Sequence, residues 1–186
     1  MASSPFPVII GLTGFAGTGK DTVAAILASD YGYQARAMGT KIQEEVLRRN
    51  PEFLWDGKMY PYSELLKTLG YERMKREVPG VRKFFTEIGH GYRLERGENV
   101  WLDHVLPNHE VFGLREPRIV ITDVRYKNEI DRIHRLGGTV WRVHRAGYYA
   151  ANTEEAASMA LVVADVNVEN NSTLDELKKR MKIIMY

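Results

Sequence analysis

A glycine-rich run after the first apolar segment constrains the fold of this chain more than any other feature. Residues 8–13 form an apolar segment rich in β-branched side chains, and a helical pattern covers residues 22–29. The run between them fits the pattern G-x-x-x-x-G-K. A chain of phosphates needs successive backbone N–H groups at the positive end of a helix, which a glycine-rich turn supplies. We therefore predict a loop that binds nucleotide phosphates, formed by Gly14, Ala16, Gly17, Thr18, Gly19, Lys20, Asp21 and Thr22.

The loop departs from the usual pattern at Asp21, where Ser or Thr commonly stands. Lys20 brings a positive charge to the β- and γ-phosphates, and the Ser or Thr normally gives an oxygen to Mg²⁺. Asp21 could serve the ion directly or through water, or could leave that contact to Thr22. The sequence thus predicts Mg²⁺ near Asp21, which we expect to act through water or to orient the ion, with Thr22 as the alternative contact.

The remaining hydrophobic patterns predict an α/β fold. Strands are expected near residues 31–36, 118–123, 139–143 and 161–168, and helices over 128–136 and 174–185. This alternation favours a doubly wound, mostly parallel sheet of about five strands in a single domain, residues 1–186. We expect a helical insertion over about 41–106, broken by prolines and Gly70, and a lid-like segment of small residues over about 146–160.

A carboxylate ends the apolar strand at 118–123, at the sheet edge where ligands bind in such folds. Asp123 is expected beside the phosphate loop, near the metal's water shell or the attacking group. The alternative is a turn cap paired with Arg125. For Arg125 itself, a clamp on phosphate and a structural salt bridge are equally open.

The insertion contains two arginines, Arg82 and Arg93, that lie eleven residues apart, which corresponds to three helical turns. Arginine can hold a phosphate through two parallel hydrogen bonds. Gly89 and Gly91 between them disfavour a continuous helix, and charged helices often simply face solvent. Trp101 could stack on a base, although its apolar neighbours make a core position the alternative.

Composition excludes several classes of protein. The 26 basic and 24 acidic residues nearly balance, which argues against a protein that depends on nucleic-acid phosphates. There is no cysteine for a disulfide or a thiolate-held metal, and the five histidines lack the spacing of a zinc site. No stretch approaches the roughly 18 apolar residues of a membrane span. We therefore expect no membrane partner and no stable nucleic-acid partner.

With these motifs in place, the chain resembles the phage-type deoxynucleoside monophosphate kinases. Four stretches carry the resemblance and reach almost from end to end: GLTGFAGTGKDTVA (11–24), VRKFFTEIGHGYRLERGENVW (81–101), ITDVRYKNEIDRIHRLGGTVWRVHR (121–145) and DVNVENNSTLDELKKRM (165–181). The third is the most specific to the family. A bare phosphate loop, by contrast, is shared by many ATPases and kinases.

The resemblance implies transfer of the γ-phosphoryl group of ATP, with Mg²⁺, to a deoxynucleoside 5′-monophosphate. Arg82 and Arg93 would then grip the acceptor phosphate, and Asp123 with Arg125 would act between the two substrates. Arg145 would neutralise developing charge, and Glu154 and Trp101 would contact substrate. The family also implies a cytoplasmic protein, in the host if phage-encoded. The accepted bases, the preferred sugar and a homodimer are left open.

Two other functions compete with this interpretation. A kinase of another small acceptor, such as dephospho-coenzyme A, would also combine a phosphate loop with a helical insertion. A nucleotide-dependent switch or nucleic-acid-binding ATPase would need a basic stripe or partner surface, and the near-neutral charge provides neither.

Overall fold

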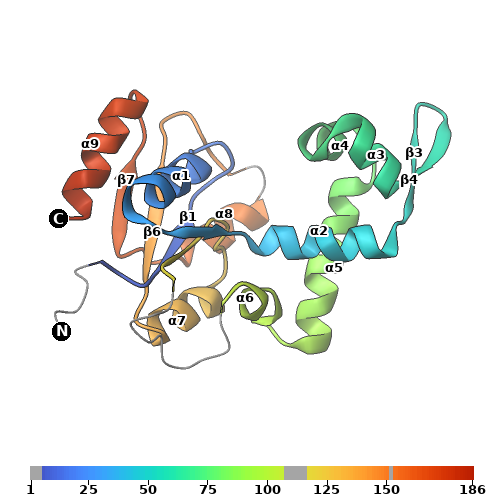
Figure 1. Cartoon of the computed structure of the whole chain (residues 1–186). Helices are drawn as coiled ribbons and strands as arrows, with labels where there is room; N and C mark the ends of the chain where they lie inside the picture. Colours follow the sequence, from blue (N-terminus) through green and yellow to red (C-terminus); the bar gives the residue numbers. More distant parts are fainter. Residues whose placement is uncertain (1–5, 107–116, 151–152) are drawn as a thin grey trace. The chain divides into compact units, whose positions relative to one another are not determined.

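The structure is a computed structural model that describes residues 6–106, 117–150 and 153–186 (Figure 1). Contacts between residues divide the chain into two compact units. The first unit contains Met1–Ala37 and Val105–Tyr186, and the second contains Met38–His104. The predicted insertion, residues 41–106, covers most of the second unit. Each unit is described by itself below.

A five-stranded parallel sheet forms the centre of the first unit. β1 (Ile9–Thr13) and β5 (Ile119–Ile121) are buried along their whole lengths, as expected for strands covered on both faces. β1 is the middle strand, with β5 on one side and β6 on the other, so the direction of winding changes beside β1. This confirms the predicted doubly wound sheet. In spatial order the strands are β2 (Gln34–Arg36), β5 (Ile119–Ile121), β1 (Ile9–Thr13), β6 (Thr139–His144) and β7 (Val166–Glu169).

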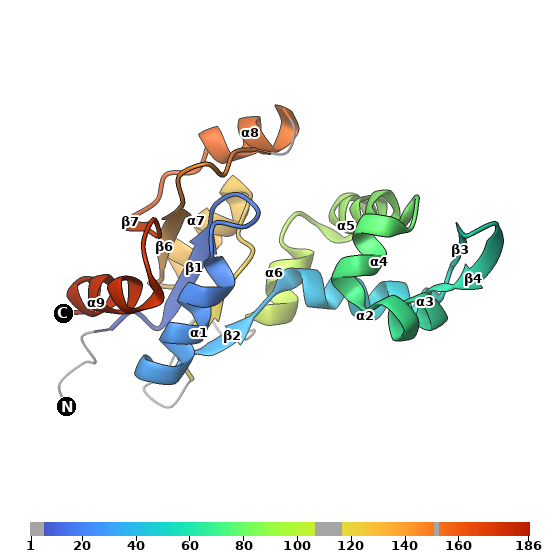
Figure 2. The same cartoon turned by 90° about the horizontal axis from the view of Figure 1, so that it is seen from above.

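Helices cover both faces of this sheet (Figure 2). α1 (Lys20–Tyr31) and α9 (Leu174–Ile184) pack on one face, where they share a buried cluster with β1 and β6. α7 (Lys127–Arg135) packs on the other face so closely that a Cβ atom at Gly11 would lie 2.7 Å from the Ile133 side chain. The buried cluster on the first face includes Ile10, Leu12, Val23, Leu27, Trp141, Val143, Leu177 and Met181.

The last strand begins later than the sequence predicts. Residues 161–168 were expected to form it, whereas β7 starts at Val166. Asp165 occupies the place beside β6 instead: its backbone N–H donates to the carbonyl of Val140 at 2.8 Å, and its carboxylate accepts from the N–H of Val140 at 2.6 Å. The Asp165 side chain thus takes the place of one of the two backbone partners that a strand would offer here. The preceding residues are left outside the sheet, with Leu161 70% exposed.

The second unit contains a β-hairpin in addition to the predicted helices. β3 (Glu52–Trp55) and β4 (Lys58–Pro61) pair antiparallel across Asp56 and Gly57. Both turn residues have positive φ, 49° and 75°, as a type I′ turn requires. The region expected as a helical insertion therefore also contains a hairpin, for which an Asp-Gly pair between segments that contain apolar residues is a sequence signal. The helices of this region are α2 (Met38–Arg49), α3 (Tyr62–Leu69), α4 (Tyr71–Glu77), α5 (Val81–Arg96) and α6 (Val100–Val105).

Helix α5 continues through both of its glycines, contrary to the expectation that they would interrupt it. Gly89 is packed against α2, since a Cβ atom there would lie 3.3 Å from Ile42, and Ile88 and Tyr92 are buried. Burial of this face outweighs the roughly 1 kcal/mol that each glycine costs a helix. Arg82 and Arg93 therefore lie on one side of a single helix, three turns apart.

Candidate nucleotide-phosphate site

The glycine-rich loop joins the carboxyl end of β1 to the first turn of α1. Three of its residues, Gly14, Gly17 and Gly19, have positive φ values of 139°, 81° and 98°. These backbone conformations are strained for residues with a side chain. The loop thereby reaches the N-terminus of α1, where unpaired N–H groups and the helix dipole attract anions.

Close neighbours explain further why these positions carry glycine. A Cβ atom at Gly14 would lie 2.3 Å from the carbonyl oxygen of Val143 in β6. A Cβ atom at Gly17 would lie 2.4 Å from the ring of Tyr148, and one at Gly19 would lie 2.2 Å from the amide nitrogen of Asn170. The loop is therefore packed from outside by residues near the carboxyl ends of β6 and β7, and its shape is set by tertiary contacts.

Asn170 is a site residue that the sequence analysis does not predict. Its side-chain amide donates to the carbonyl of Thr18 at 2.8 Å, across 152 residues of sequence. Its own backbone N–H donates to the carbonyl of His144 at 2.8 Å. Asn170 thus ties the phosphate loop to the ends of β6 and β7. An asparagine directly after the last strand was the signal available.

Lys20 is folded back over the loop. Its ammonium group donates to the carbonyl oxygens of Gly14 at 2.8 Å and Phe15 at 2.9 Å. Thr18 also bonds the carbonyl of Phe15 through its hydroxyl, at 2.9 Å. The charge of Lys20 therefore lies over the loop interior, where phosphates are expected.

The first turn of α1 offers oxygen ligands of the kind that Mg²⁺ prefers. Asp21 and Thr22 are both exposed there, directly after Lys20. Within the described residues no group of three or more His, Asp or Glu side chains could hold a metal. Mg²⁺ bound with a nucleotide does not require one, since phosphates and water supply most of its ligands. The residues present fit such an ion, and the choice between Asp21 and Thr22 stays open.

The end of β5 lies directly beside the strand that leads into the loop. The backbone N–H of Val124 donates to the carbonyl of Leu12 at 3.1 Å, and Val124 is buried. The two residues that flank it are more accessible: Asp123 is half-buried and Arg125 is exposed. The structure thus brings Asp123 and Arg125 to the same sheet edge as the phosphate loop. Their roles toward a ligand stay predictions.

Arg145 lies next to Tyr148, an aromatic residue that packs against the phosphate loop. Its guanidinium lies 5.2 Å from the centre of the Tyr148 ring, and this ring lies against Gly17. Tyr148 is 37% exposed and was not singled out in the sequence. Glu154 belongs to α8 (Thr153–Ala160), and its side chain lies outside the part that the structure describes.

The other predicted substrate residues belong to the second unit. Arg82 is exposed and Arg93 is half-buried on α5. Trp101 is only 5% exposed, stacks on Tyr92 with ring centres 5.0 Å apart, and donates its indole N–H to the carbonyl of Gly89 at 2.9 Å. The structure therefore gives Trp101 a packing role, and its contact with a ligand stays a prediction.

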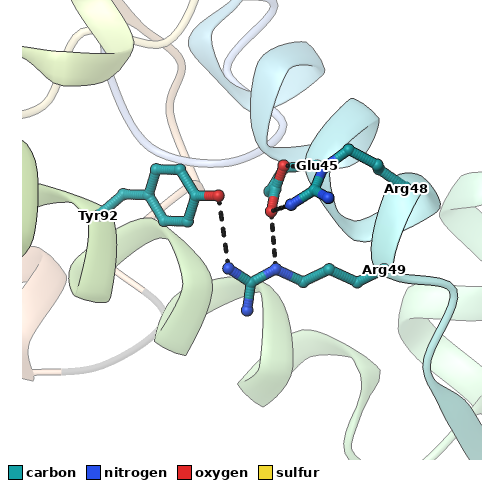
Figure 3. A network of polar contacts seen from close by, with 4 residues as sticks. All are labelled: Glu45, Arg48, Arg49 and Tyr92. Atoms are coloured by element: carbon teal, nitrogen blue, oxygen red, sulfur yellow. Dashed lines mark hydrogen bonds and ion pairs between the residues drawn. The ribbon is translucent and has the colours of Figure 1, made fainter.

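A network of charged residues in the second unit was also missed by the sequence reasoning (Figure 3). The carboxylate of Glu45 accepts two hydrogen bonds from Arg48, at 2.7 and 2.8 Å, and one from Arg49 at 2.7 Å. Arg49 also donates to the hydroxyl of Tyr92 at 3.4 Å. The hydrogen bonds of Arg48, then those of Tyr92 and Arg49, hold the pKa of Glu45 well below its usual range. The i, i+3 and i, i+4 spacing was the signal available.

This network borders a cavity of about 440 Å³ within the second unit. Tyr92 is covered by rings and cations: Trp101 stacks on it, and the guanidinium of Arg96 lies 4.5 Å from its centre. Most of the residues that line the cavity carry a charge. It is lined by Lys41, Glu44, Glu45, Arg48, Tyr92, Arg96, Trp101 and His104.

Comparison with known proteins places the chain in a family. It is 31% identical over 187 residues to the UPF0200 protein of Aeropyrum pernix, across 95% of this chain and 91% of that protein. The chain belongs to the UPF0200 family. It is also 26% identical over 196 residues to a protein of Acanthamoeba polyphaga mimivirus named "Putative deoxynucleotide monophosphate kinase", across 91% of each chain.

Among solved structures, shikimate kinase from Aquifex aeolicus aligns with this UPF0200 family member over 95% of each chain, with 14% identity and a TM-score of 0.46. A scan of the sequence against models of protein families gave no match. In the part of the chain that the structure describes, no helix is both long and apolar enough to cross a membrane.

Proposed function

We propose that this protein is an ATP-dependent kinase that phosphorylates deoxynucleoside 5′-monophosphates to diphosphates. The observation that carries the proposal is the phosphate loop, built at the carboxyl end of β1 with Lys20 folded over it and Asp123 and Arg125 on the neighbouring strand end. The name of the mimivirus relative supports the choice of acceptor. A bacteriophage origin and a cytoplasmic location stay predictions from the sequence.

In the proposed reaction the protein forms no covalent intermediate, and it acts mainly by positioning the substrates and neutralising their charge. The attacking oxygen of a monophosphate is already anionic, so no strong base is needed. Lys20 and the N-terminus of α1 would neutralise the phosphates of ATP, while Arg125 and Arg145 would offset charge that develops during transfer. Magnesium held beside Asp21 or Thr22 would neutralise phosphate charge when bound. These groups would thereby hold the phosphates of ATP and of the acceptor, which repel one another, in line for reaction.

The acceptor is proposed to bind through the second unit. Arg82 and Arg93 present guanidinium groups on one side of α5, and each can hold a phosphate through two hydrogen bonds. Residues 146–160 are proposed to close over the nucleotide and exclude water. Closure would keep ATP hydrolysis slow without an acceptor.

A coupled assay tests this function. ADP formation is measured with ATP and Mg²⁺ against the four dNMPs, the four NMPs and dephospho-coenzyme A, and with no acceptor. We expect fast turnover with at least one dNMP and slow turnover without an acceptor. Equal rates with and without nucleotide would contradict a kinase, and turnover with dephospho-coenzyme A alone would change the acceptor class.

The acceptor assignment is tested separately. Arg82→Ala and Arg93→Ala should raise the KM for the dNMP about tenfold or more, because each removes a charged hydrogen-bond partner of the phosphate. The KM for ATP should stay unchanged. Arg73→Ala is a matched control, since Arg73 lies on the neighbouring helix α4 and pairs with Glu77 at 2.7 Å. An unchanged dNMP KM in both α5 variants would contradict the assignment.

A further inference from the structure

Glu129 stands out because it is a buried carboxylate. It is 3% exposed, and among the residues that the structure describes it is the one charged residue that is buried. Burying a carboxylate is costly unless hydrogen bonds compensate for the lost water. One oxygen of Glu129, Oε2, accepts the backbone N–H of Arg125 at 2.8 Å and of Tyr126 at 3.1 Å. Oε2 of this carboxylate is therefore bonded to the backbone of both residues.

Capping of α7 explains only part of this arrangement. Glu129 is the third residue of α7, and a glutamate at that position commonly reaches back to the N–H of the N-cap, here Tyr126. The shorter of its two bonds, however, goes to Arg125, which precedes the cap. Glu129 thus fixes the turn that carries Arg125 as well as the end of the helix.

The same turn is anchored at a second point. Val124 is 1% exposed, and its N–H is bonded to β1 through Leu12. Arg125 follows immediately and is exposed at the sheet edge beside the loop. β1 holds the turn on one side of Arg125, and Glu129 holds the backbone of Arg125 itself. The direction in which this guanidinium leaves the chain depends on both.

We propose that Glu129 is a positioning residue, whose carboxylate fixes the backbone of Arg125 so that its guanidinium is aimed at the transferring phosphoryl group. This inference rests on the proposed kinase function. Glu129 itself touches no substrate, and its effect on the reaction passes through Arg125.

Three substitutions separate the parts of this role. Glu129→Ala removes both hydrogen bonds, and Glu129→Asp keeps the charge but shortens the side chain by one methylene. Glu129→Gln keeps an oxygen that can accept both N–H groups. Thr173→Ala is the matched control, because Thr173 caps α9 in the same unit by accepting the N–H of Glu176 at 3.4 Å. Loss of that cap should lower Tm by about 2–4 °C and leave kcat unchanged.

Amide hydrogen exchange tests the contact without reference to activity. We expect faster exchange at Arg125 and Tyr126 in Glu129→Ala and Glu129→Asp than in the wild type. Exchange close to the wild-type rate is expected in Glu129→Gln and Thr173→Ala. If Arg125 and Tyr126 stay as protected from exchange in Glu129→Asp and Glu129→Ala as in the wild type, the assigned role of Glu129 in fixing this turn is wrong.

A double-mutant cycle tests transmission to the reaction. Glu129→Ala and Glu129→Asp should lower kcat about 10- to 100-fold, since a small misplacement of a catalytic group costs this much. Glu129→Gln should stay within a few-fold of the wild type. In an Arg125→Ala background, Glu129→Ala should have no further effect on kcat, because the residue that it positions is gone.

Two results would overturn the inference while leaving the kinase function intact. One is the same loss of kcat from Glu129→Ala with and without Arg125. The other is a Glu129→Gln variant as slow as Glu129→Ala, which would mean that charge matters and the backbone contact does not. A wild-type protein that phosphorylates no acceptor would overturn both proposals.

Discussion

The phosphate loop and helix α5 are both rich in glycine, but glycine has a different role in each. In the loop, Gly14, Gly17 and Gly19 have positive φ, and a Cβ atom at each would lie only 2.2 to 2.4 Å from a neighbouring atom. In α5, Gly91 is an ordinary helical residue, and a Cβ atom there would have nothing within 4 Å. Sequence alone shows the same residue type in both regions. The comparison teaches that backbone conformation and neighbouring atoms, which only the structure shows, distinguish a glycine that shapes a site from one that is merely tolerated.

The largest expected effect is on activity and comes from the loop. Lys20→Ala should lower kcat for phosphoryl transfer by about 100- to 1,000-fold, because it removes a charge placed where negative charge develops. Its unfolding free energy should change little, since the ammonium is bonded to loop carbonyls, those of Gly14 and Phe15, in a partly exposed position. Steady-state kinetics and urea unfolding check the two statements. Near-normal turnover would contradict the site.

The next largest effect is on stability. Gly14→Ala should lower the unfolding free energy by about 3 kcal/mol, because it adds both an unfavourable φ of 139° and a clash with the backbone oxygen of Val143. Gly57→Ala is the matched control: its φ is 75°, but nothing lies within 4 Å. It should cost about 1 kcal/mol from strain alone. Equal losses in urea unfolding would show that the contact with Val143 does not matter.

Helix α5 should respond in the opposite direction. Gly91→Ala is expected to raise the unfolding free energy by about 0.5–1 kcal/mol, since alanine fits a helix interior better and the position is open. Differential scanning calorimetry would detect the higher Tm. A decrease would mean that Gly91 is needed for a reason other than its conformation.

The smallest expected effect concerns the acid sensitivity of the second unit. Because hydrogen bonds from Arg48, Tyr92 and Arg49 lower the pKa of Glu45, its ionised form stabilises the folded state. That contribution is fully present above the ordinary glutamate pKa of about 4.3 and is lost progressively as the pH falls from there through the lowered pKa of the folded state. Urea unfolding at pH 7 and pH 3 should show a smaller acid loss in Glu45→Gln than in the wild type. The same loss in both would contradict the assigned contacts.

Much of the first unit could be predicted from the sequence because its signals are local. A buried parallel strand is a continuous apolar run, and a phosphate loop is a short glycine pattern between a strand and a helix. The hairpin at Asp56-Gly57 also had a local signal that was not used. The late start of β7 could not be predicted, since it depends on hydrogen bonds between Asp165 and Val140, which lie 25 residues apart.

The candidate site shows the same division. Lys20, Asp21 and Thr22 follow from the loop pattern, and Asp123 and Arg125 follow from the end of an apolar strand. Asn170 and Tyr148 contact the loop from segments far along the chain, so no spacing rule could assign them. For Trp101 the sequence offered two interpretations, and the buried stack on Tyr92 supports packing.

The sequence by itself determined the parallel sheet, the phosphate loop at its edge and the charged residues at the strand ends, because these depend on residues close together in the chain. The tertiary structure decided which groups hold that loop and its neighbouring turn in place. Asn170 fixes the loop, and Glu129 fixes the backbone of Arg125. Such contacts depend on how strands and helices pack, and that packing is a property of the whole fold.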